Sequence, residues 1–185
     1  PDNPYLFEIA IWDEPEPNAV ALPGGVIAVT NGLLESVESE NELAFVLGHE
    51  LGHFHNRDHL RGLGRGIAFS LLLVAVGVGG GGSAVQLASL AGQFAQRDFS
   101  RDQEIEADRF GLRLLAAEYG HVSGAAAFFE HLPERDGALE GGLASYFSTH
   151  PVNADRVRAL RAAAGEMGWE LRGERQPLPS LHPIR

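Results

Sequence analysis

The chain has 185 residues with 14 basic and 25 acidic side chains, which gives a net charge of −11 at pH 7, and it contains no cysteine. The negative charge argues against a nucleic-acid partner and against binding to anionic lipid by charge alone. The absence of cysteine excludes disulfides and thiolate ligands, so a zinc site must use nitrogen and oxygen atoms. The length suits one domain, residues 1–185, with a core of its own.

The N-terminal part of the chain predicts a small β-sheet. Residues 5–12 have the composition of a strand and are followed by a proline-containing turn at residues 13–17. Residues 18–22 and 26–30 are short apolar segments joined by a Pro-Gly-Gly sequence, which predicts a strand–turn–strand unit. A short helix is expected at residues 33–37, before the next capping signal.

Residues 39–58 predict a long amphipathic helix. Ser39 is followed three residues later by Glu42, a capping-box spacing that starts the helix near Glu40. The helix also has an apolar stripe to bury, because hydrophobic residues recur at helical spacing: Leu43, Val46, Leu47 and Leu51.

This helix carries a His-Glu-x-x-His motif. His49 and His53 are four residues apart, so their imidazoles project from one face, one turn apart. That spacing lets two neutral imidazoles bind one Zn²⁺ at about 2.0–2.1 Å each. Glu50 lies between them, turned away from the metal but within reach of a water beside it, and is the general base in this motif. His55 points off this face and is expected at the surface or beside a ligand residue, rather than as a ligand itself.

A long apolar stretch follows the helix. Residues 67–78 are almost continuously hydrophobic, residues 79–82 are all glycine, and residues 83–95 resume the apolar pattern. Neither half has the about 20 apolar residues that a transmembrane helix needs. We expect an apolar helical hairpin, residues 67–95, inserted into the domain. Two alternatives stay open: a hairpin that dips into a membrane or receives a hydrophobic substrate, and an engineered Gly-Ser loop at residues 79–83.

The C-terminal half predicts three more helices. The first is capped by Ser100 or Asp102 and places Glu104 and Asp108, four residues apart, on one face. The expected elements are helices at residues 100–117, 122–131 and 151–164, a polar loop at residues 134–142 and an extended tail at residues 169–185. A small sheet followed by helices predicts an α+β domain that is mostly helical.

Two histidines do not complete a catalytic zinc site, which normally has three protein ligands and one open position. One candidate for the third ligand is His59, six residues after His53, but this spacing needs a glycine where Asn56 stands. Glu104 is the better candidate, because a glutamate on a separate helix can bind zinc. Asp108, one turn later, could then hydrogen-bond the free ring nitrogen of a ligand histidine.

Four ordered motifs in this chain resemble one family of peptidases. The sequence HELGH is followed by EIEAD, with Glu104 51 positions after His53. Residues 18–25 and the sequence Ser-Thr-His-Pro at residues 148–151, with Arg156 beyond it, match further segments of that family. The chain therefore resembles the gluzincin zinc metallopeptidases related to HtpX, BepA and the type I CAAX prenyl proteases. It lacks the four clear transmembrane helices of the integral-membrane members, which favours a soluble or membrane-peripheral member.

The resemblance implies a zincin-type fold and a set of site residues. The zinc ligands would be His49, His53 and Glu104, with one Zn²⁺ per chain. Glu50 would be the catalytic base, and Asp108 would support a ligand histidine by hydrogen bonding. His150 would stabilise the oxyanion or occupy the open zinc position as a self-inhibitory latch; alternatively, it only orders the loop before the following helix.

The expected function is that of a zinc-dependent endopeptidase acting on protein or peptide substrates, in particular unfolded or membrane-associated ones. A substrate strand would add to the edge of Val26–Thr30. By resemblance, we expect a bacterial periplasmic or membrane-associated envelope location and a role in protein quality control, with peripheral membrane contact through residues 67–95. Two alternatives are a latched, chaperone-like binding factor with low proteolytic activity, and a purely structural zinc site, which would leave Glu50 without a purpose.

Overall fold

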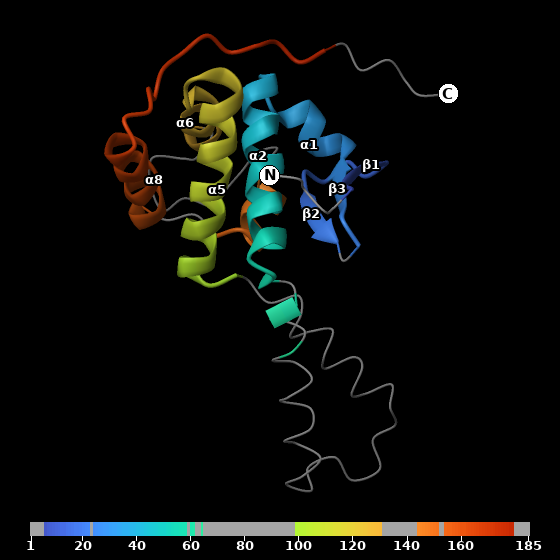
Figure 1. Cartoon of the computed structure of the whole chain (residues 1–185). Helices are drawn as coiled ribbons and strands as arrows, with labels where there is room; N and C mark the ends of the chain where they lie inside the picture. The colour runs from blue at the N-terminus through green and yellow to red at the C-terminus, as the bar shows by residue number, and fades with distance from the viewer. Residues whose placement is uncertain are drawn as a thin grey trace, which may run out of the picture.

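The computed structural model of the chain describes residues 6–22, 24–58, 60–61, 64, 99–130, 144–151 and 154–179. The expected hairpin at residues 67–95 and the loop at residues 134–142 lie outside these residues. Within them, a small sheet precedes a set of helices, which confirms the predicted α+β class (Figure 1). No helix among the described residues is long and apolar enough to cross a membrane. The elements are β1 (Glu8–Trp12), β2 (Ala19–Leu22), β3 (Val26–Thr30), α1 (Asn31–Ser36), α2 (Glu40–His55), α5 (Arg101–Tyr119), α6 (Ser123–Glu130), α7 (Ala144–Thr149) and α8 (Ala154–Glu166).

The sheet has the strand order β1-β3-β2, with β1 parallel and β2 antiparallel to β3. The turn between β2 and β3 uses Gly24 and Gly25 at φ of 99° and 89°, a left-handed conformation that favours glycine. Because β3 is paired on both sides, the expectation that Val26–Thr30 offers an open edge is wrong. Among the described residues, β1 and β2 are the outer strands of the sheet, because β1 pairs with β3 although β2 lies between them in the sequence.

Helix α2 begins where its capping signal predicted. The Ser39 side chain accepts a hydrogen bond from the backbone N–H of Glu42, and the helix runs from Glu40 to His55. The Glu42 carboxylate reaches back to the backbone N–H of Glu38, at 3.0 Å, rather than to that of the capping serine. Both bonds satisfy donors that a helix start otherwise leaves unpaired.

Helices α2 and α5 lie side by side and approach closely along a seam of small residues (Figure 1). A Cβ added at Gly48 would lie 2.9 Å from the Cα of Gly111, and one added at Gly52 would lie 2.8 Å from the Cα of Ala107. Such approaches are possible only without the glycines' side chains. The seam brings the α5 residue Glu104 within reach of the histidines on α2.

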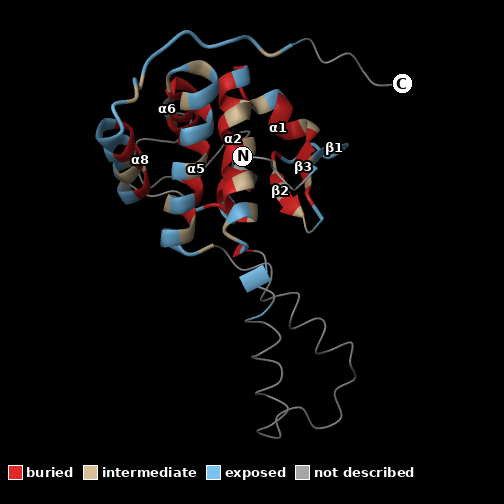
Figure 2. Cartoon of the chain, in the orientation of Figure 1, coloured by how far each residue is buried: buried red, intermediate tan, exposed pale blue. Residues whose placement is uncertain are grey.

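The core lies where the sheet, α2, α5 and α6 meet, and the red inward faces in Figure 2 mark it. Helix α2 is central, between the sheet on one side and α5 on the other, while α8 packs against α5. The most deeply buried large side chains of the core are Leu33, Phe45, Val46, Leu112, Leu115, Phe128 and Tyr146.

The C-terminal part of the chain returns to the start of α2. Helix α8 begins at Ala154, three residues later than the predicted start at Pro151. Beyond it, residues 172–179 form no helix or strand, in agreement with the predicted extended tail. The backbone oxygen of Gln176 accepts from the N–H of Glu40 at 2.9 Å, and Arg175 contacts Glu42 at 2.9 Å.

Candidate metal centre

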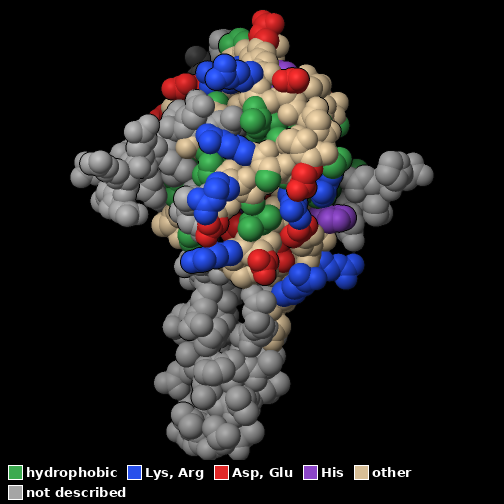
Figure 3. All heavy atoms as spheres, turned by 90° about the vertical axis from the view of Figure 1, so that its left-hand side faces the viewer, with side chains coloured by type: hydrophobic (Ala, Val, Ile, Leu, Met, Phe, Trp, Pro, Cys, Tyr) green, Lys and Arg blue, Asp and Glu red, His purple; other side chains and the backbone are tan. Residues whose placement is uncertain are grey.

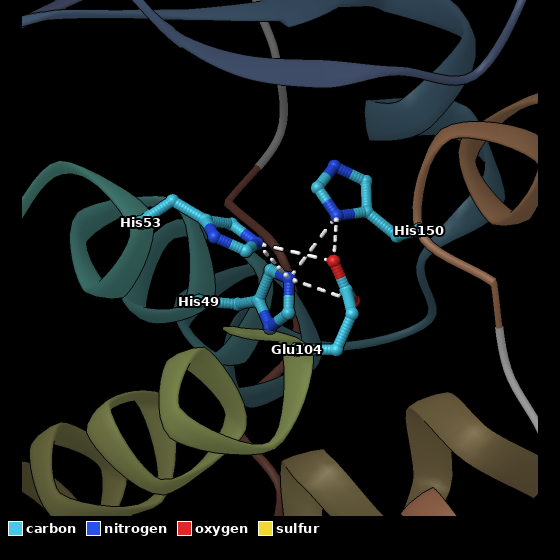
Figure 4. A group of neighbouring side chains, drawn as sticks. All are labelled: His49, His53, Glu104 and His150. Atoms are coloured by element: carbon cyan, nitrogen blue, oxygen red, sulfur yellow. Dashed lines mark hydrogen bonds and ion pairs between the residues drawn. The ribbon is translucent and has the colours of Figure 1, made fainter. Parts of the chain in front are cut away.

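Four buried side chains from three parts of the chain converge on one point (Figure 4). His49 and His53 come from α2, Glu104 from the first turn of α5, and His150 directly follows α7. Each offers one ligand atom, and all these atoms lie within 4.8 Å of one another. Nitrogen and carboxylate oxygen at such spacing form a donor set suited to zinc.

The spacing of the donor atoms fits a tetrahedral ion. The Nε2 atoms of His49 and His53 are 3.0 Å apart, and the Glu104 oxygens lie 3.5 Å and 3.3 Å from them. Ligands at about 2.0–2.1 Å from a tetrahedral zinc are separated by about 3.3 Å. His150 also fits, because its Nδ1 is 3.2 Å from both the His49 nitrogen and a Glu104 oxygen.

An aspartate holds the second ring nitrogen of both His49 and His53. His49 Nδ1 is 2.9 Å from Asp108 Oδ1, and His53 Nδ1 is 3.0 Å from Asp58 Oδ2. With the proton on Nδ1, each Nε2 is a lone-pair donor aimed at the centre. This role was expected for Asp108, whereas residue 58 was expected only as the end of the helix at residues 39–58.

Asp58 reaches the centre because the chain turns sharply after α2. Arg57 has a φ of 57°, a left-handed conformation that is uncommon for a residue with a Cβ. The turn buries the Asp58 carboxylate, where Gln103 donates a hydrogen bond to Oδ1 at 2.8 Å. The same Gln103 side chain closes the capping box of α5 with Ser100. The start of α5 is therefore tied to the His53 side of the centre.

Arg156 contacts the two buried acids on the side of the centre opposite His53. Its guanidinium makes two hydrogen bonds to the Asp108 carboxylate, at 2.6 Å and 2.8 Å, and lies 2.5 Å from Glu104 Oε2. It also donates to the backbone oxygen of His150 at 3.2 Å. One buried cation therefore connects the two acids on α5 with the backbone that positions the third histidine.

Glu50 lies beside this group, almost fully buried. Its Oε2 accepts a hydrogen bond from the backbone N–H of Ala21 on β2 at 3.2 Å. Its Oε1 is 3.3 Å from His150 Nε2 and 3.4 Å from the hydroxyl of Tyr146. The carboxylate is thus held between the sheet on one side and α7 on the other, next to the ligand cluster.

The surroundings of Glu104 and Asp108 keep both carboxyl groups ionised. Burial opposes ionisation of Glu104, but hydrogen bonds from His150 and His53 outweigh it and hold the pKa of that carboxyl far below its usual value. Burial also opposes ionisation of Asp108, and the charge of Arg156 overcomes it and lowers that pKa. Both acids are therefore anionic, as metal binding requires.

His49 and His53 differ in basicity. Burial lowers the pKa of His49 below its usual value, so its ring is neutral at pH 7. Burial also acts on His53, but the hydrogen bonds to Asp58 and Glu104 outweigh it and raise its pKa to about 9. Without a metal ion, His53 is therefore the protonated member of this pair at pH 7.

The other histidines near α2 do not join this group within the described residues. His55 is exposed, and its ring lies beside that of Phe110, with centroids 5.1 Å apart. His59 lies outside the described residues. Sequence reasoning missed Asp58, Tyr146 and the aromatic ring of Phe99, which stacks on His53 at a centroid distance of 3.8 Å.

Known proteins share this sequence over most of its length. The profile of peptidase family M48 matches residues 1–164. The mitochondrial metalloendopeptidase OMA1 of Arabidopsis thaliana is 35% identical over 158 residues, which cover 85% of this chain and 31% of that protein. The metalloprotease LoiP of Escherichia coli is 32% identical over 148 residues, 78% of this chain and 57% of its own length. A putative beta-barrel assembly-enhancing protease of Vibrio cholerae is 32% identical over 158 residues, 80% of this chain and 32% of its own length. The chain therefore spans between about a third and somewhat more than half of these relatives.

Proposed function

Since the chain belongs to peptidase family M48 and carries a metalloendopeptidase domain, we propose that the whole protein is a zinc-dependent endopeptidase acting on protein substrates. The zinc metallopeptidase family expected from the sequence motifs is confirmed. Peptidases of this family depend on zinc, and the buried histidine and glutamate group could hold such an ion. The tetrahedral spacing of His49, His53 and Glu104, with Glu50 beside them, is the observation that carries this proposal.

In this proposal His49, His53 and Glu104 hold one Zn²⁺ per chain. When bound, zinc supplies Lewis acidity that polarises a carbonyl and lowers the pKa of a water. Asp108 and Asp58 keep the Nδ1 proton of each histidine in place, so that both Nε2 lone pairs face the centre. Arg156 keeps Glu104 and Asp108 ionised and in position.

Glu50 acts as the general base. Its carboxylate takes a proton from the attacking water and later delivers it to the nitrogen of the leaving amine. The backbone N–H of Ala21 fixes Oε2, which leaves Oε1 facing the ligand cluster. The side chain is buried, so bulk water does not compete for this proton.

His150 supports a second candidate function, a latched enzyme with low activity that binds clients as a chaperone would. Its Nδ1 lies at ligand spacing from His49 and Glu104, where it could occupy the fourth zinc position. If it instead stabilises the oxyanion, it must turn its ring toward the substrate carbonyl. His150→Ala separates the two roles, because activity rises in a latched enzyme and falls if the ring assists catalysis.

The substrate would add as a strand to β2 rather than to β3. The N–H of Thr30 donates to the backbone oxygen of Asn18, so the ladder places the backbone groups of Ala19 and Ala21 toward the open edge. The contact of the Ala21 N–H with Glu50 supports this direction. A peptide on that edge would run past the general base, with its backbone bonded by β2.

The mixed charge of one surface face does not favour a nucleic-acid substrate. Figure 3 shows arginines and acidic side chains interspersed on the face that carries α5 and α8. Arg109 pairs there with Glu106 at 3.0 Å, and Arg158 pairs with Asp155. On the described residues of this face, mixed charge offers no continuous basic stripe for a phosphate backbone.

We place the protein in a bacterial envelope, periplasmic or membrane-associated, with a role in protein quality control. The name of the Vibrio cholerae relative, a putative beta-barrel assembly-enhancing protease, supports this setting. Unfolded or membrane-associated proteins would be its clients. Peripheral membrane contact would use the apolar residues 67–95 of the single domain 1–185.

Hydrolysis of casein by the zinc-loaded chain, with the fragments identified by mass spectrometry, tests the function. We expect internal cleavage that stops when a chelator removes the metal and returns when Zn²⁺ is added. If one zinc is bound but casein stays intact, while His150→Ala cleaves it, the latched enzyme is the correct alternative. If the chain binds no zinc at all, the proposed function is wrong.

A further inference from the structure

One buried hydroxyl near Glu50 has no part in the mechanism so far. Tyr146, on α7, is about 1% exposed, and its hydroxyl donates to Glu50 Oε1 at 3.4 Å. Its ring packs edge-on against Phe128, with centroids 5.6 Å apart, and stacks on His150 at 4.7 Å. A phenylalanine would make the same ring contacts. The hydroxyl is therefore an addition to this core position that packing does not require.

The hydroxyl completes a set of donors around the Glu50 carboxylate. Ala21 holds Oε2 from β2, while Tyr146 and His150 approach Oε1 from α7 and the residue after it. Tyr146 and His150 are four residues apart, and their rings stack with an interplanar angle of 23°. A general base that must receive a proton at one defined position gains from such two-sided fixation.

We propose that Tyr146 is a positioning residue, whose hydroxyl holds the Glu50 carboxylate in the orientation that proton transfer needs. This inference rests on the proposed peptidase function. The role does not depend on His150, because a histidine that turns toward a substrate carbonyl would release Oε1, while the Tyr146 hydroxyl would still donate to that oxygen.

The hydroxyl is suited to this task because it stays protonated. Burial, followed by the negative charge of Glu50, raises the pKa of Tyr146 well above its usual value. The neutral hydroxyl can therefore donate a hydrogen bond to the carboxylate. A neutral donor also fixes the carboxylate without adding a charge that would weaken it as a base.

The test is Tyr146→Phe, with Tyr119→Phe as the matched control. Tyr119 also donates its hydroxyl to a glutamate on α2, Glu40, at 2.9 Å, but at the far, solvent-exposed end of the helix. We expect Tyr146→Phe to lower kcat for casein peptides about tenfold or more, with KM within twofold and zinc content unchanged. Tyr119→Phe should match the wild type in all three. Equal kcat values for the two variants would overturn the inference.

A double-mutant cycle shows whether the hydroxyl acts through Glu50. In Glu50→Asp the carboxylate is one methylene shorter and retreats from the hydroxyl. Adding Tyr146→Phe to it should then lower the residual kcat by less than twofold. A full additional loss in that background would show that the hydroxyl acts elsewhere, and would overturn the assignment to the base.

Crystal structures of Tyr146→Phe and Tyr119→Phe give a readout that is independent of activity. We expect the Glu50 carboxylate to rotate away from its wild-type position only in Tyr146→Phe. If the wild type binds zinc but cleaves nothing, the proposed function fails. The crystal structures still show whether the Tyr146 hydroxyl holds the Glu50 carboxylate in place. An unmoved Glu50 in Tyr146→Phe would refute it even in an active enzyme.

Discussion

Asp58 offers no ligand atom to the candidate metal centre, but it contacts a histidine that does. Its carboxylate accepts from His53 Nδ1 at 3.0 Å and is itself held by Gln103 at 2.8 Å. This fixes both the tautomer and the rotation of the imidazole. Exchanging such a partner typically weakens metal binding about 10–100-fold.

We therefore expect Asp58→Asn to weaken zinc binding about 10–100-fold, because the amide nitrogen can face the imidazole and the acceptor is uncharged. Asp102→Asn, a change of the same kind at an exposed position on the first turn of α5, is the control. Competition with a fluorescent zinc chelator measures both. Equal affinities for the two variants would show that Asp58 is dispensable.

The pKa of His53 predicts how the stability of the metal-free protein depends on pH. The folded protein holds this proton up to about pH 9, whereas a histidine in the unfolded chain releases it near pH 6.5. The stabilisation is therefore complete below about pH 6.5 and is lost as the pH rises through about 9. Its full size is of the order of a few kcal/mol.

Thermal unfolding of the chelated protein between pH 7 and 10 checks this expectation. The Tm should fall across the range, because the folded state loses its advantage in proton binding. A chelated His53→Asn variant, which has no proton to lose there, should show a flatter profile. A Tm of the wild type that stays constant or rises over this range would contradict the raised pKa.

The candidate ligands could be proposed from the sequence, whereas some of the residues that hold the site in position could not. His49, Glu50 and His53 form a local pattern. Glu104 and Asp108 lie one helical turn apart on another helix, which is also a local pattern. Asp58 depends on the left-handed Arg57, for which the sequence gives no glycine signal. Tyr146 reads in the sequence as an ordinary core aromatic, because its contact with Glu50 spans 96 residues of chain.

At the scale of elements, the packing of α2 against α5 determines the distance between the ligands. Gly52 and Gly48 let the two helices approach until a Cβ would contact the neighbouring backbone. Glu104 lies on the first turn of α5, about one helical turn before Ala107, so a wider seam would move it away from His53. The seam is therefore part of the metal centre.

Gly52→Ala should destabilise the protein by about 1–3 kcal/mol and weaken zinc binding, because its Cβ would lie 2.8 Å from the Cα of Ala107. Gly165→Ala is the control, since that helical glycine of α8 has no neighbouring atom within 4 Å of an added Cβ. The control should be neutral or stabilising, as alanine favours a helix. Urea unfolding of both variants decides; a Gly52→Ala protein as stable as the control would show that the helices can separate without cost.

The starts of the long helices follow from local signals, while the order of the strands does not. Ser39 and Ser100 cap α2 and α5 as expected, because capping requires only residues a few positions apart. The placement of β3 between β1 and β2 depends on a parallel pairing with β1 across an intervening strand. Short apolar runs carry no information about that order, which is why the substrate edge was assigned to the wrong strand.

For the molecule as a whole, the tail after α8 ties the start of α6 to the start of α2. The backbone oxygen of Glu170 accepts from the N–H of Val122 beside α6, and that of Gln176 accepts from Glu40 on α2. The N–H of Gln176 in turn donates to the side chain of Asn41 at 2.7 Å. The family match ends at residue 164, so this support of the active-site helix lies beyond it.

A chain that ends at residue 168 should therefore unfold about 5–10 °C below the full chain. The loss removes two backbone bonds at helix starts, the Arg175–Glu42 pair and the packing of apolar tail residues, together worth about 2–3 kcal/mol. A chain that ends at residue 179 is the control and should keep its Tm. Equal melting temperatures for the two truncations would show that the tail contributes nothing to the fold.

One paired assay decides whether Glu50 serves as the base at a zinc centre formed by α2 and α5. Casein cleavage and zinc content are measured side by side for the wild type, Glu50→Gln and the exposed control Glu106→Gln. All three should hold one zinc per chain, while Glu50→Gln alone loses cleavage by about 10²–10⁴-fold or more. If pure, zinc-loaded Glu50→Gln cleaves casein at the wild-type rate, Glu50 is not the base.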